Sequence, residues 1–302
     1  ALVYSTYLGG THADSGVGVA ADAMGQAVVV GSTLSSAFPT TVAAIQPTFS
    51  GGMCGSFPCS DSFAFKVSAD GSGLVYSTYM GIIAKNDLAH DVALDSAGNA
   101  YIVGGGQPVP SALPAVGPGD AFVVKLTPTG GLSYVKGLGG SGYEEGLGVA
   151  VDGSHSAYVM GYTVSADFPT VNAFQAVPQA SGPHYFVSKL DPTGTDLVYS
   201  SYLGSGTEWN TEGKIAVDGF GNAYVAGVTH SALFPALNPL LSCTGAFYGQ
   251  TTLTKVDATG SALVYSTCFG GADPNPAIVV AVGGQGAAYL TGAVAGFVDF
   301  PT

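Results

Sequence analysis

One pattern of apolar and small polar residues, Leu-Val-Tyr-Ser-Thr-Tyr-Leu-Gly-Gly at residues 2–10, recurs along the whole chain. Later copies begin at Leu74, Leu132, Leu197 and Leu263, so successive copies start 58 to 72 residues apart. Leu, Val, Tyr and Thr favour a pleated strand, and bulky side chains alternate onto both faces of each copy. Each copy therefore predicts a β-strand covered on both sides, and the near-constant period predicts a repeat architecture.

Three further strand-like segments recur between these copies. The first is short and rich in Gly, Ala and Val, at residues 16–22, 91–95, 146–152, 213–218 and 277–283. A glycine-containing turn then leads to a second strand, at residues 27–31, 100–104, 157–161, 223–227 and 287–292. The third follows a long loop with a Phe-Pro-Thr motif, at residues 62–67, 121–126, 185–190 and 251–256. No stretch has the 3.6-residue period of a helix, so the sequence predicts an all-β chain.

A four-stranded antiparallel unit repeated about every 60 residues is typical of a β-propeller. We expect one domain over residues 1–302, with blades at 13–81, 88–140, 145–205, 211–271, and 277–302 together with 1–10. In this arrangement the N-terminal strand closes the ring in the last blade, which lacks a third strand. A stacked, open solenoid is the alternative architecture. The uncharged stretch 277–298 is long enough to span a membrane, but it is rich in glycine and aligns with a strand pair, so we expect no membrane span.

The repeats resemble the SBBP (seven-bladed β-propeller-type) repeat family. The resemblance lies in Asp-x-x-Gly-Asn-Ala-Tyr at residues 95–101 and 218–224, Phe-x-x-Lys-Leu at 122–126 and 186–190, the Phe-Pro-Thr loops and the recurring Leu-Val-Tyr-Ser-Thr-Tyr strand. It implies a propeller in an extracellular or cell-surface bacterial protein, and it supplies no catalytic motif. The chain departs from the family pattern because it has five sets of repeats instead of seven.

The composition limits the classes of partner. The net charge is −13, charged residues make up 9% of the chain, and all seven cationic residues are Lys. Nucleic acid and anionic membranes are therefore poor partners, because both bind through clustered positive charge.

The cysteine count is even, and Cys54 and Cys59 stand in one tight loop. We expect the disulfides Cys54–Cys59 and Cys243–Cys268, and hence an oxidising compartment. Free thiols are the alternative. Zinc is disfavoured because no further ligands lie at suitable spacing.

Two ionisable positions repeat along the chain. Lys66, Lys125, Lys189 and Lys255 occupy the third strand, and Asp22, Asp95, Asp152 and Asp218 occupy the end of the first. The fifth set lacks both the Lys and the Asp. This joint absence predicts that they pair within a blade and hold structure, and do not bind ligand.

A third group of residues lies between the recurring strand and the next first strand, where loops would emerge on one face of a propeller. The acidic members are Asp14, Asp87, Glu144, Glu145, Glu208, Glu212 and Asp273, with Tyr143 and Trp209 among them. This set could bind a cation, or a sugar stacked on Trp209, or form only a solvated loop face. The five histidines have no metal-binding spacing, and we expect no metal site, no cofactor and no catalytic residue.

The sequence thus predicts a non-enzymatic extracellular or cell-surface module with a structural or adhesive role. Its partners would be cell-surface components or other copies of itself, and the incomplete last blade could accept a strand from a second copy and build filaments. The first alternative is a carbohydrate-binding module that uses the long-loop face. A polysaccharide-active enzyme is the second alternative, because propellers can host carboxylate pairs.

Overall fold

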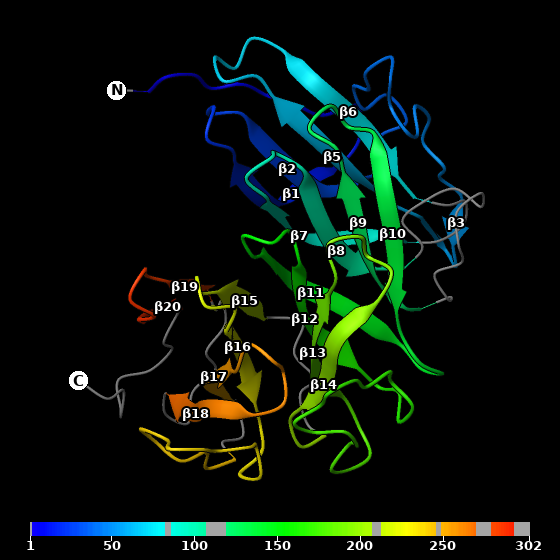
Figure 1. The fold of residues 1–302 in the computed structure, drawn as a ribbon. Helices are drawn as coiled ribbons and strands as arrows, with labels where there is room; N and C mark the ends of the chain where they lie inside the picture. The colour runs from blue at the N-terminus through cyan, green and yellow to red at the C-terminus, as the bar shows by residue number, and fades with distance from the viewer. Residues whose placement is uncertain are drawn as a thin grey trace, which may run out of the picture. The chain divides into compact units, whose positions relative to one another are not determined.

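The structure is a computed structural model that describes residues 2–81, 86–106, 119–206, 213–245, 249–269 and 279–292 (Figure 1). The described residues form β-strands, turns and loops and contain no helix. None of them belongs to a helix that could cross a membrane. The chain divides into two compact units, residues 1–138 and 139–302, and each is described by itself below.

The first unit contains two four-stranded antiparallel sheets. One has the order β1-β2-β5-β6, with strands β1 (Asp14–Ala21), β2 (Ala27–Thr33), β5 (Asp61–Val67) and β6 (Leu74–Met80). The other has the order β10-β9-β8-β7, with β7 (Leu88–Leu94), β8 (Ala100–Gly105), β9 (Ala121–Leu126) and β10 (Leu132–Leu138). A small hairpin of β3 (Met53–Cys54) and β4 (Phe57–Pro58) lies in the loop between β2 and β5.

The second unit repeats the same plan. One sheet has the order β11-β12-β13-β14, with β11 (Glu144–Val151), β12 (Ala157–Thr163), β13 (His184–Leu190) and β14 (Leu197–Leu203). The next has the order β15-β16-β17-β18, with β15 (Lys214–Val217), β16 (Ala223–Thr229), β17 (Gln250–Val256) and β18 (Leu263–Phe269). A two-stranded sheet of β19 (Val279–Val282) and β20 (Ala288–Thr291) follows.

Within each unit, neighbouring sheets bury apolar faces against each other, which explains why the central strands are apolar on both sides. In the first unit Val28, Val30 and Tyr76 share a core cluster with Ile102 and Phe122 of the other sheet. In the second unit Tyr158 and Met160 of one sheet and Ile215 and Val225 of the next belong to one core cluster. Burial of this apolar surface is the main stabilising contribution to the stack.

The Phe-Pro loops are tied to the recurring Tyr-Ser-Thr-Tyr strand. In the first unit Phe38 stacks on Phe63, with 4.5 Å between ring centroids, and its backbone N–H donates to the Tyr79 hydroxyl at 2.8 Å. That hydroxyl donates in turn to the Ser35 carbonyl at 2.7 Å. Phe168 and Tyr202 repeat this arrangement in the second unit. The two motifs therefore recur together because each is the other's packing partner.

The structure differs from the sequence-based expectations at residues 2–13 and at the starts of β1 and β11, and it confirms the expected disulfides. Residues 2–13 form no strand, although residues 2–8 match β6 in sequence; Tyr4 and Leu8 pack on the first sheet, and no described strand pairs with this segment. Asp14 and Glu144, expected in loops, are the first residues of β1 and β11, because these strands extend past a bulge near Gly16 and Gly146. The disulfides Cys54–Cys59 and Cys243–Cys268 are both present, as predicted.

Candidate functional site

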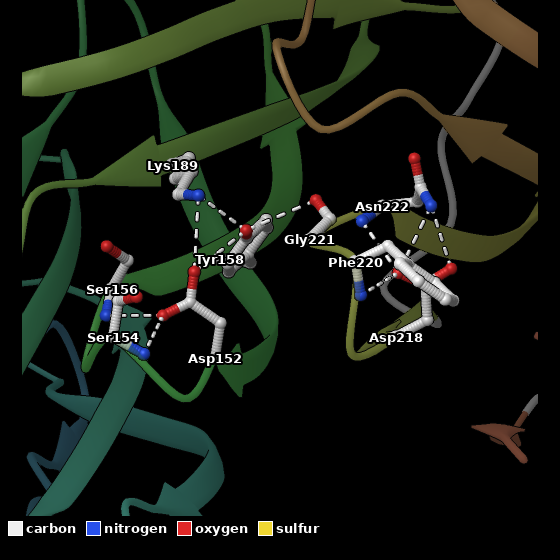
Figure 2. A network of polar contacts seen from close by, with 9 residues as sticks. All are labelled: Asp152, Ser154, Ser156, Tyr158, Lys189, Asp218, Phe220, Gly221 and Asn222. Carbon is white, nitrogen blue, oxygen red and sulfur yellow. Dashed lines mark hydrogen bonds and ion pairs between the residues drawn. The ribbon is translucent and has the colours of Figure 1, made fainter. Parts of the chain in front are cut away.

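A repeated polar network joins the turn of each first hairpin to the lysine of the third strand, and Figure 2 shows one copy. Oδ1 of Asp152 accepts the backbone N–H groups of Ser154 at 2.9 Å and Ser156 at 3.0 Å, which closes the turn between β11 and β12. Its Oδ2 accepts the Tyr158 hydroxyl at 3.0 Å and lies 3.2 Å from Lys189 Nζ. The carboxylate therefore has partners on both oxygens.

The lysine lies between strands because of the sheet register. Lys189 of β13 is directly opposite Tyr158 of β12, and its ammonium is 2.6 Å from the tyrosine hydroxyl and 4.6 Å from the ring centroid. Burial raises the pKa of Asp152, but hydrogen bonds from Ser156, Lys189 and Tyr158 outweigh burial, so the pKa lies below its usual value. The network thus stabilises an ionised carboxylate at neutral pH.

The tyrosine also connects one sheet to the next. Its hydroxyl lies 3.2 Å from the Gly221 carbonyl, in the turn between β15 and β16 that Asp218 closes through Phe220 and Asn222 (Figure 2). In the following copy the Tyr224 hydroxyl donates to the Gly286 carbonyl at 3.0 Å. The same set of side chains therefore closes a turn, pairs two strands and contacts the neighbouring sheet.

The predicted ion pairing is present in the structure. Lys66–Asp22, Lys189–Asp152 and Lys255–Asp218 have N–O distances of 2.9, 3.2 and 3.5 Å. In the remaining repeat the Lys125 ammonium lies 4.7 Å above the Tyr101 ring, and Tyr101 donates to Asp95 at 3.1 Å. The first repeat has Val28 where the others have tyrosine, so the ion pair forms there without the hydroxyl.

Two acidic residues at the start of the first strands, at the other end of the hairpin from the Asp152-type turn, also have hydrogen-bond partners within the fold. The Asp14 carboxylate accepts hydrogen bonds from the Gly10 N–H at 2.7 Å and from the Thr33 hydroxyl. Glu144 is fully buried and accepts the corresponding bonds from the Gly140 N–H at 3.1 Å and the Thr163 hydroxyl at 2.6 Å. Both carboxylates are thus hydrogen-bonded within their own sheet and loop, which differs from the solvated loop face that was one alternative for this set.

Tyr143 and Glu145 both contact Tyr162, a residue that the sequence analysis did not identify. Tyr162, opposite Glu145 in the register, donates its hydroxyl to Glu145 Oε2 at 2.9 Å, and its ring centroid is 6.0 Å from that of Tyr143. Glu145 is buried, whereas Tyr143 is 43% exposed. Burial and the Glu145 charge both raise the pKa of Tyr143, so the phenol stays neutral.

These three residues depart from the repeat. The pair opposite each other at this register is Ser15 with Ser32 in the first sheet and Leu88 with Gly105 in the second, in contrast to Glu145 with Tyr162. Comparing repeats position by position would have identified Tyr162 from the sequence. The cluster is therefore a local addition to the scaffold.

The rest of the predicted acidic set is only partly described. Asp87 is fully buried, whereas Trp209, Glu208, Glu212 and Asp273 lie outside the described residues. Among the residues that the structure describes, no group of three or more His, Cys, Asp or Glu side chains could hold a metal ion. The predicted ligand-binding role of the set stays a prediction.

Comparison with known proteins supports the repeat assignment. Residues 198–235 match the family model described as the SBBP β-propeller repeat, as the resemblance predicted. No curated protein sequence matches the chain. The all-β architecture of antiparallel four-stranded sheets is consistent with a propeller-like fold, whereas the number of blades and the closure of a ring remain predictions.

The solved structures that match the chain include the two that follow. One is a mutant of the NanB sialidase from Streptococcus pneumoniae, with a TM-score of 0.53 and 8% sequence identity, covering 94% of this chain and 53% of that chain. This chain thus spans about half the length of that protein. The other is a protein of unknown function from Bacteroides caccae, with a TM-score of 0.37 and 14% identity, covering 84% of this chain and 82% of that chain.

Proposed function

We propose that this chain, which carries a repeat of the SBBP type, is a non-enzymatic extracellular β-propeller module with a structural or adhesive role. The observation that carries the proposal is the use of the repeated ionisable groups. Lys189, Asp152 and Tyr158 are mutually bonded, and Glu144 is bonded to its own loop. Groups engaged in this way stabilise a scaffold and leave no activated nucleophile or base among themselves.

The extracellular location rests on the disulfides. Cys54–Cys59 and Cys243–Cys268 both join cysteines whose Cα atoms are 5.2 Å apart, and no described cysteine is free. Disulfides persist in secreted and surface proteins and are rare in reducing compartments. SBBP-type repeats are also typical of extracellular proteins, so both features support the same location.

The proposal includes self-association of the chain through the edge of β20. Tyr289 of β20 is 65% exposed, whereas Tyr101, Tyr158 and Tyr224 at the same repeat position are fully buried and lie on strands that pair with a third strand. Beside β20 lies a groove of about 650 Å³ whose lining includes Leu253 and other apolar residues of the second unit. A strand from a second copy with the pattern of β17 would pair with β20 and fill this groove, and repetition of that exchange would build filaments.

Light scattering and electron microscopy of the purified chain test self-association. The expected result is a mass that rises with concentration, together with elongated particles. Tyr289→Lys, which places a charge at the exposed edge, should reduce the association, whereas Lys125→Met in a buried repeat position should not. A monomer at all concentrations refutes self-association, and release of reducing sugar from any polysaccharide refutes the non-enzymatic proposal.

Carbohydrate binding is the second candidate, and the departure of Tyr143, Glu145 and Tyr162 from the repeat favours it. An exposed tyrosine face can stack on a sugar ring. Beside Tyr143 lies the Tyr162 ring, which Glu145 holds in place by accepting its hydroxyl. With a net charge of −13 and no Arg, the chain would favour neutral sugars over acidic ones.

A glycan array tests this candidate. We expect binding to neutral glycans that falls at least about tenfold in Tyr143→Ala, the effect of losing one stacked ring. Tyr7→Ala is the matched control, because Tyr7 is fully exposed and lies in the other unit. Equal binding by both variants would remove the Tyr143 cluster from consideration.

A further inference from the structure

The first sheet packs one face against its neighbour and leaves part of the other face exposed. Gly18 of β1 lies against β7, since a Cβ added there would be 3.2 Å from the Asp91 Cα. Side chains alternate between the two faces of a strand, so Val19 points the opposite way, and it is 69% exposed. The β1 end of this outer face is therefore open.

The two-stranded sheet of the second unit has the same asymmetry. Val280 of β19 is 7% exposed and shares a core cluster with Tyr224 of the preceding sheet. Val279 of β19 and Tyr289 of β20, by contrast, are 51% and 65% exposed. This sheet therefore also has one face buried against a neighbour and one open face with apolar side chains.

The position of Val19 is a packing position in other sheets. Val19 lies three residues before the aspartate of the first-hairpin turn, as Val92 and Ile215 do in their sheets. Val92 and Ile215 are buried, and each belongs to a core cluster with the sheet that precedes its own in the same unit. The repeat thus uses this position for contact with a preceding sheet, and Val19 has the side chain for that contact although it is exposed.

The exposed Tyr289 supplies a second match. Tyrosines at its position in the two preceding sheets each donate a hydrogen bond to the turn glycine of the next sheet: Tyr158 to the Gly221 carbonyl at 3.2 Å and Tyr224 to the Gly286 carbonyl at 3.0 Å. The corresponding glycine of the first sheet is Gly25, which also has a positive φ, of +79°. A sheet packed on the first sheet in the same way would bring its tyrosine to the Gly25 carbonyl.

Residues 2–8 already hold one strand position of such a preceding sheet. Tyr4 covers the turn between β5 and β6, where a Cβ added at Gly71 would lie 2.4 Å from its ring. Fourth-strand tyrosines of complete sheets cover the corresponding turn of the next sheet in the same way: Tyr76 over Gly130 and Tyr199 over Gly260. A groove of about 490 Å³ lies beside residues 4–8, and its lining includes Val19 and Val29 of the first two strands. The places of a first and a second strand over this sheet are therefore open.

We propose that the open face of the first sheet binds the open face of β19–β20 from a second copy, so that copies join end to end. β19 and β20 are a first and a second strand, the two for which the groove has room. Because one chain carries both faces, the contact is head to tail and can repeat. The inference rests on the self-association proposed above and adds a face-to-face contact to it, which leaves the edge of β20 available for strand pairing.

Electrostatics do not oppose this contact at close range. Residues 277–298 carry no charged side chain, so β19 and β20 bring no charge of their own onto the first sheet. The net charge of −13 repels two copies at longer range, and salt screens that repulsion. Association of the unaltered chain should therefore strengthen as the salt concentration rises.

Disulfide cross-linking between two single-cysteine variants tests the contact directly. All four native cysteines are paired, so an introduced thiol is the only free one. A Cβ added at Gly148, four residues before its turn aspartate, would lie 3.1 Å from Lys214 and Ile215 of the next sheet. Val279 holds the same position in β19, so we expect Val279→Cys mixed with Val19→Cys to give a covalent dimer under mild oxidation. Val42→Cys is the matched control for Val19→Cys, because Val42 is fully exposed in a loop of the same unit, and it should give at least about tenfold less.

Light scattering of two further variants separates this contact from pairing at the β20 edge. Tyr289→Phe keeps the backbone edge and loses the hydroxyl, and it should weaken association about fivefold, the effect of one neutral hydrogen bond. Val19→Lys places a charge on the open face and should weaken association at least about tenfold. Circular dichroism should show both variants folded, since both side chains are exposed.

Three results would overturn the inference. Association that Val19→Lys leaves unchanged, with no cross-link above the control, rejects the face contact and retains pairing at the β20 edge. A cross-link that forms within one chain of the double variant Val19→Cys/Val279→Cys, and not between copies, assigns the open face to the chain's own β19–β20. An unaltered chain that stays monomeric at every salt concentration rejects the proposed self-association together with this contact.

Discussion

Replacing Tyr158 with Phe tests whether the repeated network holds the sheets together. The change removes one hydroxyl and keeps the ring in the core, so packing should be preserved. The hydroxyl accepts from Lys189 at 2.6 Å, donates to Asp152 at 3.0 Å and lies 3.2 Å from the Gly221 carbonyl. Because Lys189 and Asp152 remain 3.2 Å apart, the ion pair itself survives.

The expected loss of stability is limited by the hydrogen bonds that the variant keeps. Asp152 keeps the N–H groups of Ser154 and Ser156, so only one of its hydrogen bonds disappears. A hydrogen bond to a charged group contributes roughly 1.5–3 kcal/mol and a neutral one about 1 kcal/mol. The Lys189 side chain is 14% exposed, so water can replace part of the loss. We therefore expect Tyr158→Phe to lower the free energy of unfolding by about 1–2 kcal/mol.

Urea unfolding followed by far-UV circular dichroism measures this change, with Tyr7→Phe as control because the Tyr7 ring is fully exposed. The midpoint should fall in Tyr158→Phe at unchanged m-value, since the surface exposed on unfolding is the same. The control should be unaffected. If Tyr158→Phe loses less than about 0.3 kcal/mol, a value within ordinary surface effects, the inter-sheet role assigned to the hydroxyl is wrong.

The remaining predictions address three other parts of the chain. Replacing both cysteines of Cys243–Cys268 with Ser should cost about 3.5 kcal/mol by the loop-entropy relation for a 25-residue separation, measured by urea unfolding, and free thiols in non-reducing peptide mapping of the unaltered chain would remove the basis for this. Burial raises the pKa of Asp218, but hydrogen bonds led by those from Asn222 lower it to about 2, so its contribution to stability is present above the unfolded pKa near 3.9 and is lost as the pH falls towards 2. Asp218→Asn should flatten this acid limb of stability against pH, and an unchanged limb would contradict the assigned pKa. Gly260→Ala would place a Cβ 2.0 Å from the Tyr199 ring at φ +74° and should cost more than about 1 kcal/mol, whereas Gly284→Ala, with nothing within 4 Å, should be tolerated.

Much of the architecture follows from local sequence. The alternating apolar strands, the glycine turns and the recurring Asp and Lys positions specify four complete four-stranded sheets, because each strand's neighbours in the sheet are close to it in the chain. The pairing of Lys189 with Asp152 could be inferred from their joint recurrence and is present. The nearness of Cys54 and Cys59 in the chain likewise indicated their disulfide.

Tertiary structure decided the properties that depend on contacts between distant segments. Residues 2–8 match β6 but form no strand, because backbone hydrogen bonds need a neighbouring strand and no described strand pairs with them. The sequence placed Asp87 in a loop that could bind a cation or a sugar or be only solvated. It did not indicate that Asp87 is buried near Asp61, since only the packing of β5 against the segment before β7 brings both carboxylates to Gly81. Strand propensity is a property of a segment, whereas pairing, burial and the environment of a charge are properties of the assembled sheets.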